Sequence, residues 1–444
     1  MASPRTPKYA ILSHTWETEE VLFDDICDPA QPLPSQKKDL AKLRGGCVRA
    51  RRNGYRYIWI DTCCINKSSS AELSESINSM FQWYHKSARC YAYLADVNAT
   101  GADGVAFEKS RWFTRGWTLQ ELIAPEHDCF YDTYWSFLGR RHADITAFDD
   151  SHAEDLAERI SLTTGIPIPI LRWPRKSLED FFRLLLKRLN SDDYYDAGLS
   201  EALSSFSIAQ KMSWAARRLT TRVEDEAYSL MRLFGVNMPL LYGEGRHAFF
   251  RLQQEILRTS NDQSILASVQ ENSGRIWEPC PLLASSPRSF SDSSVERPTV
   301  GVPVWPRDNT QPLPGAPKLS PFAKALEISL CLCPLNLEPF YGEPRRSHGR
   351  AERGTYYFGI LDCVYQTDFM SHPAIVLQDV DMTRQNFVRV NGYQLRKTSP
   401  VDLTTTSPEL WSDKSIDSER KAAPFCVLTS SSSSHLLIYS VAGC

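Results

Sequence analysis

Short apolar runs separated by amphipathic segments alternate along the first 135 residues of the chain. Four of these runs predict buried β-strands: YAILS at 9–13, YIWID at 57–61, CYAYL at 90–94 and DCFYD at 128–132. Apolar residues at helical spacing predict helices over 36–52 and from Ser69 to Ala88, the second with capping-box spacing between Ser69 and Glu72. This alternation predicts an α/β fold, with a parallel sheet that helices cover on both faces.

The segment RWFTRGWTLQELIAP, residues 111–125, predicts a short helix that carries one carboxylate among bulky apolar residues. Phe113, Trp117 and Glu121 follow one another at one-turn spacing and therefore share a face of this helix. Another face is expected to pack on the sheet, and it consists of Trp112, Gly116, Leu119 and Ile123. We expect burial against aromatic rings to raise the pKa of Glu121, and the arginines at 111 and 115 to oppose that rise if they are near.

The pattern changes twice after the fourth predicted strand. Residues 141–270 are mainly helical by pattern, with helices expected from Thr221, through capping-box spacing with Glu224, to a glycine cap at Gly235, and over 246–258. Beyond residue 270, thirteen of the 27 prolines lie between 279 and 344, and strand-like runs appear: ALEISLCL, TYYFGIL, NFVRV and HLLIYSV. We therefore expect three domains: α/β over 1–140, helical over 141–270, and β-rich with long loops over 271–444.

Composition and charge narrow the function classes. Apolar residues make up 42% and charged residues 23%, as in ordinary globular proteins, and the net charge of −3 argues against nucleic acid as a partner. No apolar run reaches the roughly 18 residues of a membrane span. The N-terminus lacks the apolar segment of a signal peptide, so we expect a cytoplasmic protein with reduced cysteines. The twelve cysteines form no C-x-x-C pair and no H-E-x-x-H occurs, so neither a metal nor a bound cofactor is expected.

Polar residues follow the first two predicted strands at the point where a parallel sheet binds its ligands. Ser13, His14 and Trp16 follow the first strand, and Asp61 and Asn66 follow the second. One interpretation is a ligand crevice in which Trp16 stacks on a base and Asp61 or Asn66 holds a ribose hydroxyl. The other is structural: His14 bonds backbone groups, Trp16 fills the core, and Asp61 and Asn66 start turns.

Two further motifs contain residue types that can take part in catalysis or phosphate binding. Cys63 and Cys64, with His14 as a base, form a thiol-nucleophile hypothesis, although adjacent cysteines after a buried strand more often pack in the core. The run YGEG at 242–245 lacks the G-K-S/T ending of a phosphate loop, so we expect it to be a turn between helices.

Several long stretches together resemble the fungal heterokaryon-incompatibility (HET) domain: YAILSHTW, the stretch from YIWIDTCCINK to CYAYLADV, and RGWTLQELIAP. The stretch from MSWAARRLTTRVEDEAYSL to FFRLQQEI resembles the helical segment that commonly follows that domain, and PLLASSPRSF resembles the start of the region beyond it. Many relatives read C-I-D-Q where this chain has Cys64 to Lys67, and often G-T-K where it has Gly139, Arg140 and Arg141. The resemblance implies a role in nonself recognition and programmed cell death when incompatible hyphae fuse.

The HET domain in turn resembles TIR domains, which implies a TIR-like or flavodoxin-like parallel sheet with flanking helices. TIR domains often carry W-C-x-x-E-L, and this chain has Trp117 to Leu122 as WTLQEL. Some TIR domains cleave NAD at the nicotinamide–ribose bond with the glutamate of that motif, which corresponds to Glu121. The resemblance therefore makes Glu121 the candidate catalytic residue, Trp117 a candidate substrate-binding residue, and NAD a substrate.

The resemblance and the residue pattern suggest two classes of function, an enzyme and a signalling module, and give less support to a third. The first is an NAD glycohydrolase that kills the cell by depleting NAD, with Ser13, His14, Trp16, Asp61 and Asn66 around the substrate. The second is a module without chemistry that signals by self-association through the TIR-like domain or by binding an incompatibility partner protein. The third, a nuclease or other hydrolase, requires a cluster of acidic metal ligands that the sequence does not contain.

Overall fold

The computed structural model divides the chain into two compact units. The first contains Met1–Ser204 and Arg217–Ala248, and the second contains Ser205–Ala216 and Phe249–Cys444. The structure describes residues 7–27, 37, 39–98, 106–141, 154–173, 199–200, 202–269, 279–291, 318–320, 325–335, 356–361, 372–380, 386–390, 396–398 and 434–439. Among these residues, no helix is both long and apolar enough to span a membrane.

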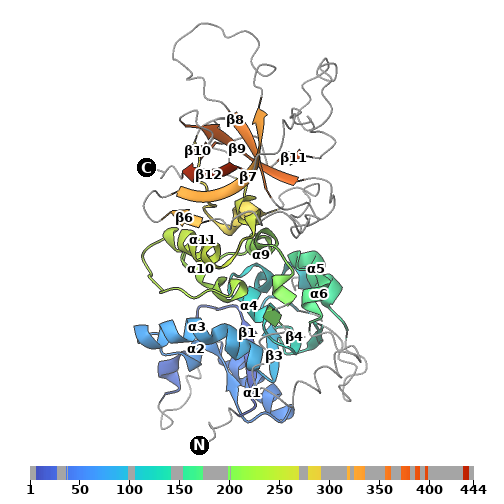
Figure 1. The fold of residues 1–444 in the computed structure, drawn as a ribbon. Helices are drawn as coiled ribbons and strands as arrows, with labels where there is room; N and C mark the ends of the chain where they lie inside the picture. The colour runs from blue at the N-terminus through green and yellow to red at the C-terminus, as the bar shows by residue number, and fades with distance from the viewer. Residues whose placement is uncertain are drawn as a thin grey trace, which may run out of the picture. The chain divides into compact units, whose positions relative to one another are not determined.

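The first unit is built on a five-stranded sheet (Figure 1). Its strands are β1 (Ala10–His14), β2 (Ile58–Trp59), β3 (Arg89–Tyr93), β4 (Asp128–Tyr131) and β5 (Phe137–Arg140). Their order is β2-β1-β3-β4-β5, the first four are parallel, and β5 runs antiparallel to β4. The predicted parallel sheet is thus confirmed, in the flavodoxin-like order, whereas the fifth strand was not expected.

Helices α1 to α4 connect the four parallel strands, as a parallel sheet requires. The helical elements of the first unit are η1 (Phe23–Asp25), α1 (Leu40–Arg52), α2 (Asp61–Cys64), α3 (Ser70–Lys86), η2 (Phe107–Lys109), η3 (Arg111–Thr114), α4 (Thr118–Ile123), α5 (Ala157–Thr164), α6 (Ile168–Leu171), α10 (Asp225–Tyr228) and η4 (Met231–Phe234). The predicted start of α3 is confirmed, because the Ser69 hydroxyl accepts a hydrogen bond from the Glu72 N–H.

Both faces of the sheet are buried, because alternate strand residues enter two different cores. One core joins Leu12 and Tyr93 of the strands to Leu40 and Ala50 of α1. On the other face the Tyr84 hydroxyl of α3 donates to the Leu12 carbonyl at 3.0 Å, so α3 lies against β1. All five residues of β1 are buried, which explains its uninterrupted apolar pattern.

The predicted single helix over 111–125 is wrong. A 3-10 turn, η3, is followed by Arg115 in an extended conformation, and α4 starts only at Thr118. The backbone of this break pairs with a distant segment instead: the Gly116 N–H donates to the Leu219 carbonyl and the Leu219 N–H to the Thr114 carbonyl. Tertiary hydrogen bonds therefore replace the helical ones at a glycine, where helix propensity is low.

The predicted helix from Thr221 to Gly235 is also divided, into α10 and η4, and its capping box does not form. The Glu224 carboxylate accepts hydrogen bonds from the N–H groups of Gly243 and Gly245, at 2.8 and 3.0 Å. The YGEG run is accordingly a turn closed around a carboxylate. The glycine cap is confirmed, since Gly235 ends η4 in the left-handed conformation with φ 68°.

The second unit combines helices with a β-rich C-terminal part. Its helical elements are α9 (Ile208–Ala215), α11 (His247–Thr259, which starts in the first unit), η5 (Gln263–Leu266) and η6 (Pro287–Phe290). Its strands are β6 (Lys318–Ser320), β7 (Ala325–Leu335), β8 (Tyr356–Ile360), β9 (His372–Asp379), β10 (Asn386–Arg389), β11 (Arg396–Thr398) and β12 (Ser434–Tyr439). The four predicted C-terminal strands, now β7, β8, β10 and β12, are confirmed.

These strands form one mostly antiparallel sheet that closes on itself. The pairing runs β10-β12-β7-β8-β9, and β9 also pairs with β10, while β6 and β11 attach to β7 and β9. The pairing of β10 with β12 is parallel, and the other pairings are antiparallel. Closure of this kind pairs backbone N–H and C=O groups that, on an open edge strand, could bond to another chain.

We predict that Gly116→Ala destabilises the first unit. A Cβ atom at this position would lie 2.4 Å from the Thr220 Cγ2 methyl group, so Thr220 must move. We expect a loss of about 1–3 kcal/mol in the free energy of unfolding, measured by urea denaturation. Thr220→Ser removes that methyl group and keeps the hydroxyl that donates to the Arg222 carbonyl, so the double variant should recover most of the loss. Equal losses with and without Thr220→Ser would show that this contact does not limit the packing.

Candidate functional site

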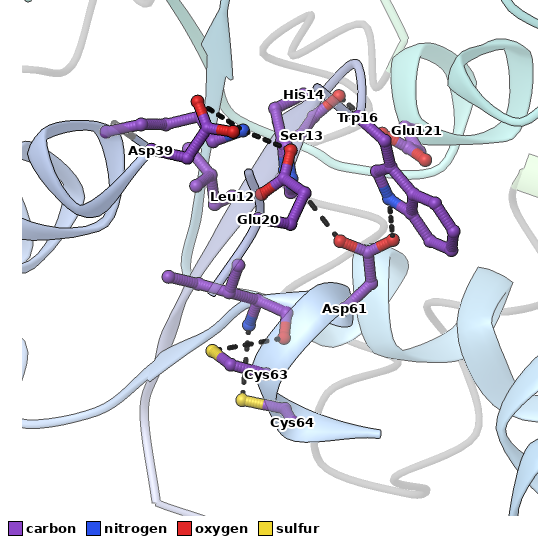
Figure 2. A network of polar contacts seen from close by, with 12 residues as sticks. Leu12, Ser13, His14, Trp16, Glu20, Asp39, Asp61, Cys63, Cys64 and Glu121 are labelled. Carbon is purple, nitrogen blue, oxygen red and sulfur yellow. Dashed lines mark hydrogen bonds and ion pairs between the residues drawn. The ribbon is translucent and has the colours of Figure 1, made fainter. Parts of the chain in front are cut away.

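Two neighbouring residues at the end of β1 start two polar networks (Figure 2). Successive side chains of a strand point to opposite faces of the sheet. Ser13 bonds Glu121 of α4, whereas His14 lies near Glu20 and near Asp61 of α2. The carboxyl end of β1, which lies between β2 and β3 where the strand order reverses, therefore gathers acidic groups from three segments.

The first network is buried and centred on Ser13. Its hydroxyl donates to Glu121 Oε2 at 2.5 Å and accepts a hydrogen bond from the indole N–H of Trp112 at 2.8 Å. The Tyr84 hydroxyl is a second hydrogen-bond partner of the Glu121 carboxyl. The Glu121 residue is only 6% exposed, and Ser13, Tyr84 and Trp112 are buried as completely. These contacts join β1, α3, η3 and α4 through one hydroxyl group and one carboxyl group.

The pKa of Glu121 is raised to about 8, mainly by burial and also by the nearby negative charge of Asp61. Hydrogen bonds from Ser13 and Tyr84 and the charge of Arg115 oppose the rise. The expected direction and its main cause are therefore confirmed, as is the effect of Arg115. Arg111 plays no such part, because it pairs with Glu17 at 2.5 Å on the exposed surface. At neutral pH most Glu121 side chains carry a proton.

A second buried charge fixes the end of the helix that carries Glu121. The Arg141 guanidinium donates to the carbonyls of Leu122 and Pro125 at 2.9 and 2.5 Å and pairs with Asp128 at 2.9 Å. A cation bonded to the last carbonyls of a helix stabilises its C-terminus.

The second network surrounds His14. Its ring nitrogens lie 3.7 Å from Glu20 Oε2 and 3.8 Å from Asp61 Oδ1, and the Lys42 ammonium pairs with the other oxygen of Glu20. Burial by itself would raise the pKa of Glu20, but the hydrogen bonds and charges of His14 and Lys42 outweigh it and lower the pKa to about 2. The structural interpretation of His14 as a partner of backbone groups is not supported, since its neighbours are carboxylates.

Trp16 forms the exposed rim of this site. Its indole N–H donates to Asp61 Oδ2 at 2.7 Å, and the Lys67 ammonium lies 3.5 Å from the centre of its ring. The residue is 46% exposed, so the expectation that it fills the core is wrong. Asp61 is held between Trp16 and His14 rather than by its own backbone. The rim thus offers an aromatic surface with one cation on it.

The structure brings together five of the seven residues that the sequence suggested. Ser13 and Glu121 share one network, and His14, Trp16 and Asp61 share the other. Asn66 and Trp117 take part in neither of these networks.

Asn66 forms a turn, because its side-chain oxygen accepts hydrogen bonds from the N–H and hydroxyl groups of Ser68 at 3.1 and 2.6 Å. Trp117 hydrogen-bonds to Asp225. The indole beside Glu121 is that of Trp112, because the break at Gly116 rotates the two halves of the predicted helix relative to each other. Sequence spacing correctly indicated that Glu121 is buried but gave it the wrong tryptophan as a neighbour.

The cysteine pair has no link to His14 among the described contacts. The Cys63 thiol donates to the Ile60 carbonyl, and the Ile60 N–H donates to the Cys64 sulfur at 3.4 Å. The neighbouring Cys63 thiol is the main reason that the pKa of Cys64 is lowered, although burial opposes this shift. Within the residues that the structure describes, no three His, Cys, Asp or Glu side chains are arranged to hold a metal ion.

These features define what the site can do chemically. Glu121 can exchange a proton near neutral pH, because its pKa lies close to it. The rim can stack a planar ring on Trp16 and attract negative charge with Lys67. Residues that spacing did not reveal are Trp112, Tyr84, Glu20 and Lys42, since each acts through a contact with a residue at least 20 positions away.

We predict that Glu121→Gln changes how stability depends on pH. A raised pKa means that the folded state holds this proton more tightly than the unfolded state, so the stability it gives is lost as pH rises from about 4.5 to about 8. The variant lacks this loss. The quantity to compare is the free energy of unfolding of the variant minus that of the wild type. Between about pH 4.5 and about pH 8 this difference should increase by roughly 2–4 kcal/mol in favour of the variant. Urea denaturation across this range measures the effect, with Glu158→Gln on the exposed surface as the control.

We predict the opposite pH dependence for Glu20→Gln. The lowered pKa of Glu20 gives stability that is present above pH 4.5 and lost as pH falls toward 2. The variant also leaves Lys42 buried without its carboxylate, so it should lose about 2–4 kcal/mol at neutral pH and less at about pH 3. A stability difference that stays constant with pH would contradict the pairing of Glu20 with His14 and Lys42.

Comparisons with known proteins identify the segment that carries most of this site. Residues 9–106 match the family described as heterokaryon incompatibility protein (HET). The chain is similar to vegetative incompatibility protein HET-E-1 of Podospora anserina, at 39% identity over 280 residues, which cover 61% of this chain and 17% of that relative. No solved structure matches the chain. Strands β1 to β3 and helices α1 to α3 all lie in the matched segment, so residues 9–106 of this chain match the HET domain.

Proposed function

We propose that this protein acts in heterokaryon incompatibility, the response that follows fusion of genetically different fungal cells, and that it triggers programmed cell death there. The similarity to a vegetative incompatibility protein supports this role. The chain spans less than a fifth of that relative, so the role proposed concerns the HET domain and the regions directly after it.

The mechanism we propose is cleavage of NAD at the nicotinamide–ribose bond by a TIR-like site centred on Glu121. The observation that carries it is the position of this acid: a buried carboxyl group with a pKa of about 8, at the carboxyl edge of a parallel sheet where the strand order reverses. Perturbed acids in such positions are characteristic of functional sites. Trp16 and Lys67 supply an aromatic surface and a positive charge at the rim, which suit a dinucleotide.

The reaction needs one carboxylate and one water molecule. The bond between the ribose C1′ and the nicotinamide nitrogen breaks, its electron pair leaves with neutral nicotinamide, and positive charge develops on the ribose. An ionised Glu121 would stabilise that charge or accept a hydrogen bond from a ribose hydroxyl. Water then adds to C1′ and loses a proton, so the products are nicotinamide, ADP-ribose and one proton.

The second candidate is a module without chemistry that signals by self-association or by binding an incompatibility partner protein. The burial of Glu121 favours it, because the carboxyl already has two hydrogen-bond partners, Ser13 and Tyr84, and is 6% exposed. NAD cleavage requires that this carboxyl become reachable from the rim at Trp16 and Asp61. The two candidates therefore differ in one measurable property, turnover.

We predict that the full-length protein releases nicotinamide from NAD and that Glu121→Gln lowers the rate at least about 100-fold. Because the ionised acid is required, the wild-type rate should rise between about pH 7 and pH 9. Nicotinamide is measured by chromatography, and cell death is measured on expression in a fungal host, with Glu158→Gln as the control. Cell death that persists in Glu121→Gln, without nicotinamide release by either protein, would favour the signalling module.

A further inference from the structure

The segment from Arg217 to Arg222 lies about 100 positions after α4 and returns to it. Its Leu219 backbone exchanges hydrogen bonds of 2.8 and 2.6 Å with Gly116 and Thr114, which forms a parallel bridge at the break before α4. The Arg115 guanidinium donates to the Thr221 hydroxyl at 2.7 Å. Neither this segment nor α4 belongs to the matched residues 9–106. Both belong to the same compact unit.

This return places the Arg218 guanidinium against the first turn of α4. Its Nη1 donates to the Thr118 hydroxyl and to the Arg115 carbonyl, both at 2.9 Å. Arg218 is 6% exposed, so its positive charge has been removed from water. Burial lowers the pKa of Arg218, and the charge of Glu121 opposes this shift. A guanidinium nevertheless stays protonated at neutral pH, so a buried cation bonds the first turn of the helix that carries the buried acid.

Hydrogen bonds connect Arg218 to Glu121 by a second route. The Thr118 hydroxyl, which accepts from Arg218, is within hydrogen-bond distance of the Trp112 carbonyl. The Trp112 indole donates to Ser13, and Ser13 donates to Glu121. One end of this chain therefore fixes the helix that carries the acid, and the other end fixes its carboxyl group.

We infer that Arg218 is a positioning residue for Glu121: the segment 217–222 completes the site by bonding the first turn of α4 and by placing a buried cation beside the carboxyl group. The inference rests on the proposed function in that it takes Glu121 as the functional acid. The functional unit then extends beyond the matched domain, to a segment that connects α9 to α10.

The charged and titratable groups that face Glu121 come from five places in the fold. Asp61 lies on α2, Tyr84 on α3, Cys90 on β3, Arg115 in the break before α4, and Arg218 on the returning segment. Asp61 opposes ionisation of Glu121 and the two arginines favour it. Arg218 is the buried one of the two, so its charge is the less screened by water.

The test is a double-mutant cycle of Arg218→Gln and Glu121→Gln in the full-length protein, by urea denaturation at about pH 6 and about pH 8.5. At the higher pH, Arg218→Gln should shift the unfolding equilibrium roughly tenfold further in the wild type than in Glu121→Gln, and the excess should shrink at the lower pH. Arg218→Lys, which retains the charge, should restore most of the coupling. Arg222→Gln is the matched control. Arg222 lies in the same segment as Arg218, but its guanidinium stacks on the ring of Tyr242.

Equal effects of Arg218→Gln in both backgrounds at both pH values would overturn the inference. If Arg218→Gln does not fold, the same cycle with Arg218→Met decides, since this variant also removes the charge and should show the same excess effect at the higher pH. Where NAD cleavage is measurable, Arg218→Gln should move the pH of half-maximal rate upward by about one unit, and Arg222→Gln should not move it. Absence of cleavage in the wild type would count against the proposed reaction and would leave the cycle as the test of Arg218.

Discussion

The hydrogen bond from Ser13 to Glu121 joins the first strand of the sheet to the helix that precedes its fourth strand. A carboxyl group can be buried at this depth only if its oxygens find partners, because an unpartnered buried polar group costs about 1–3 kcal/mol or more. Ser13 and Tyr84 are the partners of the Glu121 carboxyl, and the Trp112 indole in turn donates to Ser13, so three different elements contribute. The arrangement of β1, α3, η3 and α4 therefore depends on the same few polar atoms that make Glu121 a candidate for chemistry.

Burial has two opposite consequences for catalysis by Glu121. Enclosure raises the pKa of Glu121 toward the range in which proton exchange is useful, and the same enclosure keeps a substrate away from it. The more exposed groups, Trp16 and Lys67, lie at the rim of the neighbouring His14 network. An enzyme of this kind would bind its ligand at the rim and reach the acid by a local rearrangement, whereas a signalling module would keep the acid enclosed as part of its core.

The segment that starts at Arg217 packs against residues just beyond the matched segment 9–106, so the structural unit is larger than the matched segment. The matched residues end before α4, yet the backbone just before α4 is paired with Leu219, and Arg218 lies against the helix. Removal of that segment would expose the hydrogen-bonding groups of Thr114 and Gly116 and the Thr118 hydroxyl at once. Stability and site geometry in the first unit are consequently shared between regions that are far apart in the sequence.

The sequence by itself determined the strands, the parallel sheet and the identity of the buried acid. Runs such as YAILS and CYAYL can be read from the local sequence, because a strand that is buried on both faces of a sheet has a nearly continuous apolar sequence. Tertiary structure alone decided that α4 starts at Thr118, that the Trp112 rather than the Trp117 indole donates to Ser13 next to Glu121, and that Arg218 bonds Thr118. Each of these depends on a hydrogen bond between segments about 100 positions apart. Periodicity reports only which face of one element is apolar, so it carries no information about such partners.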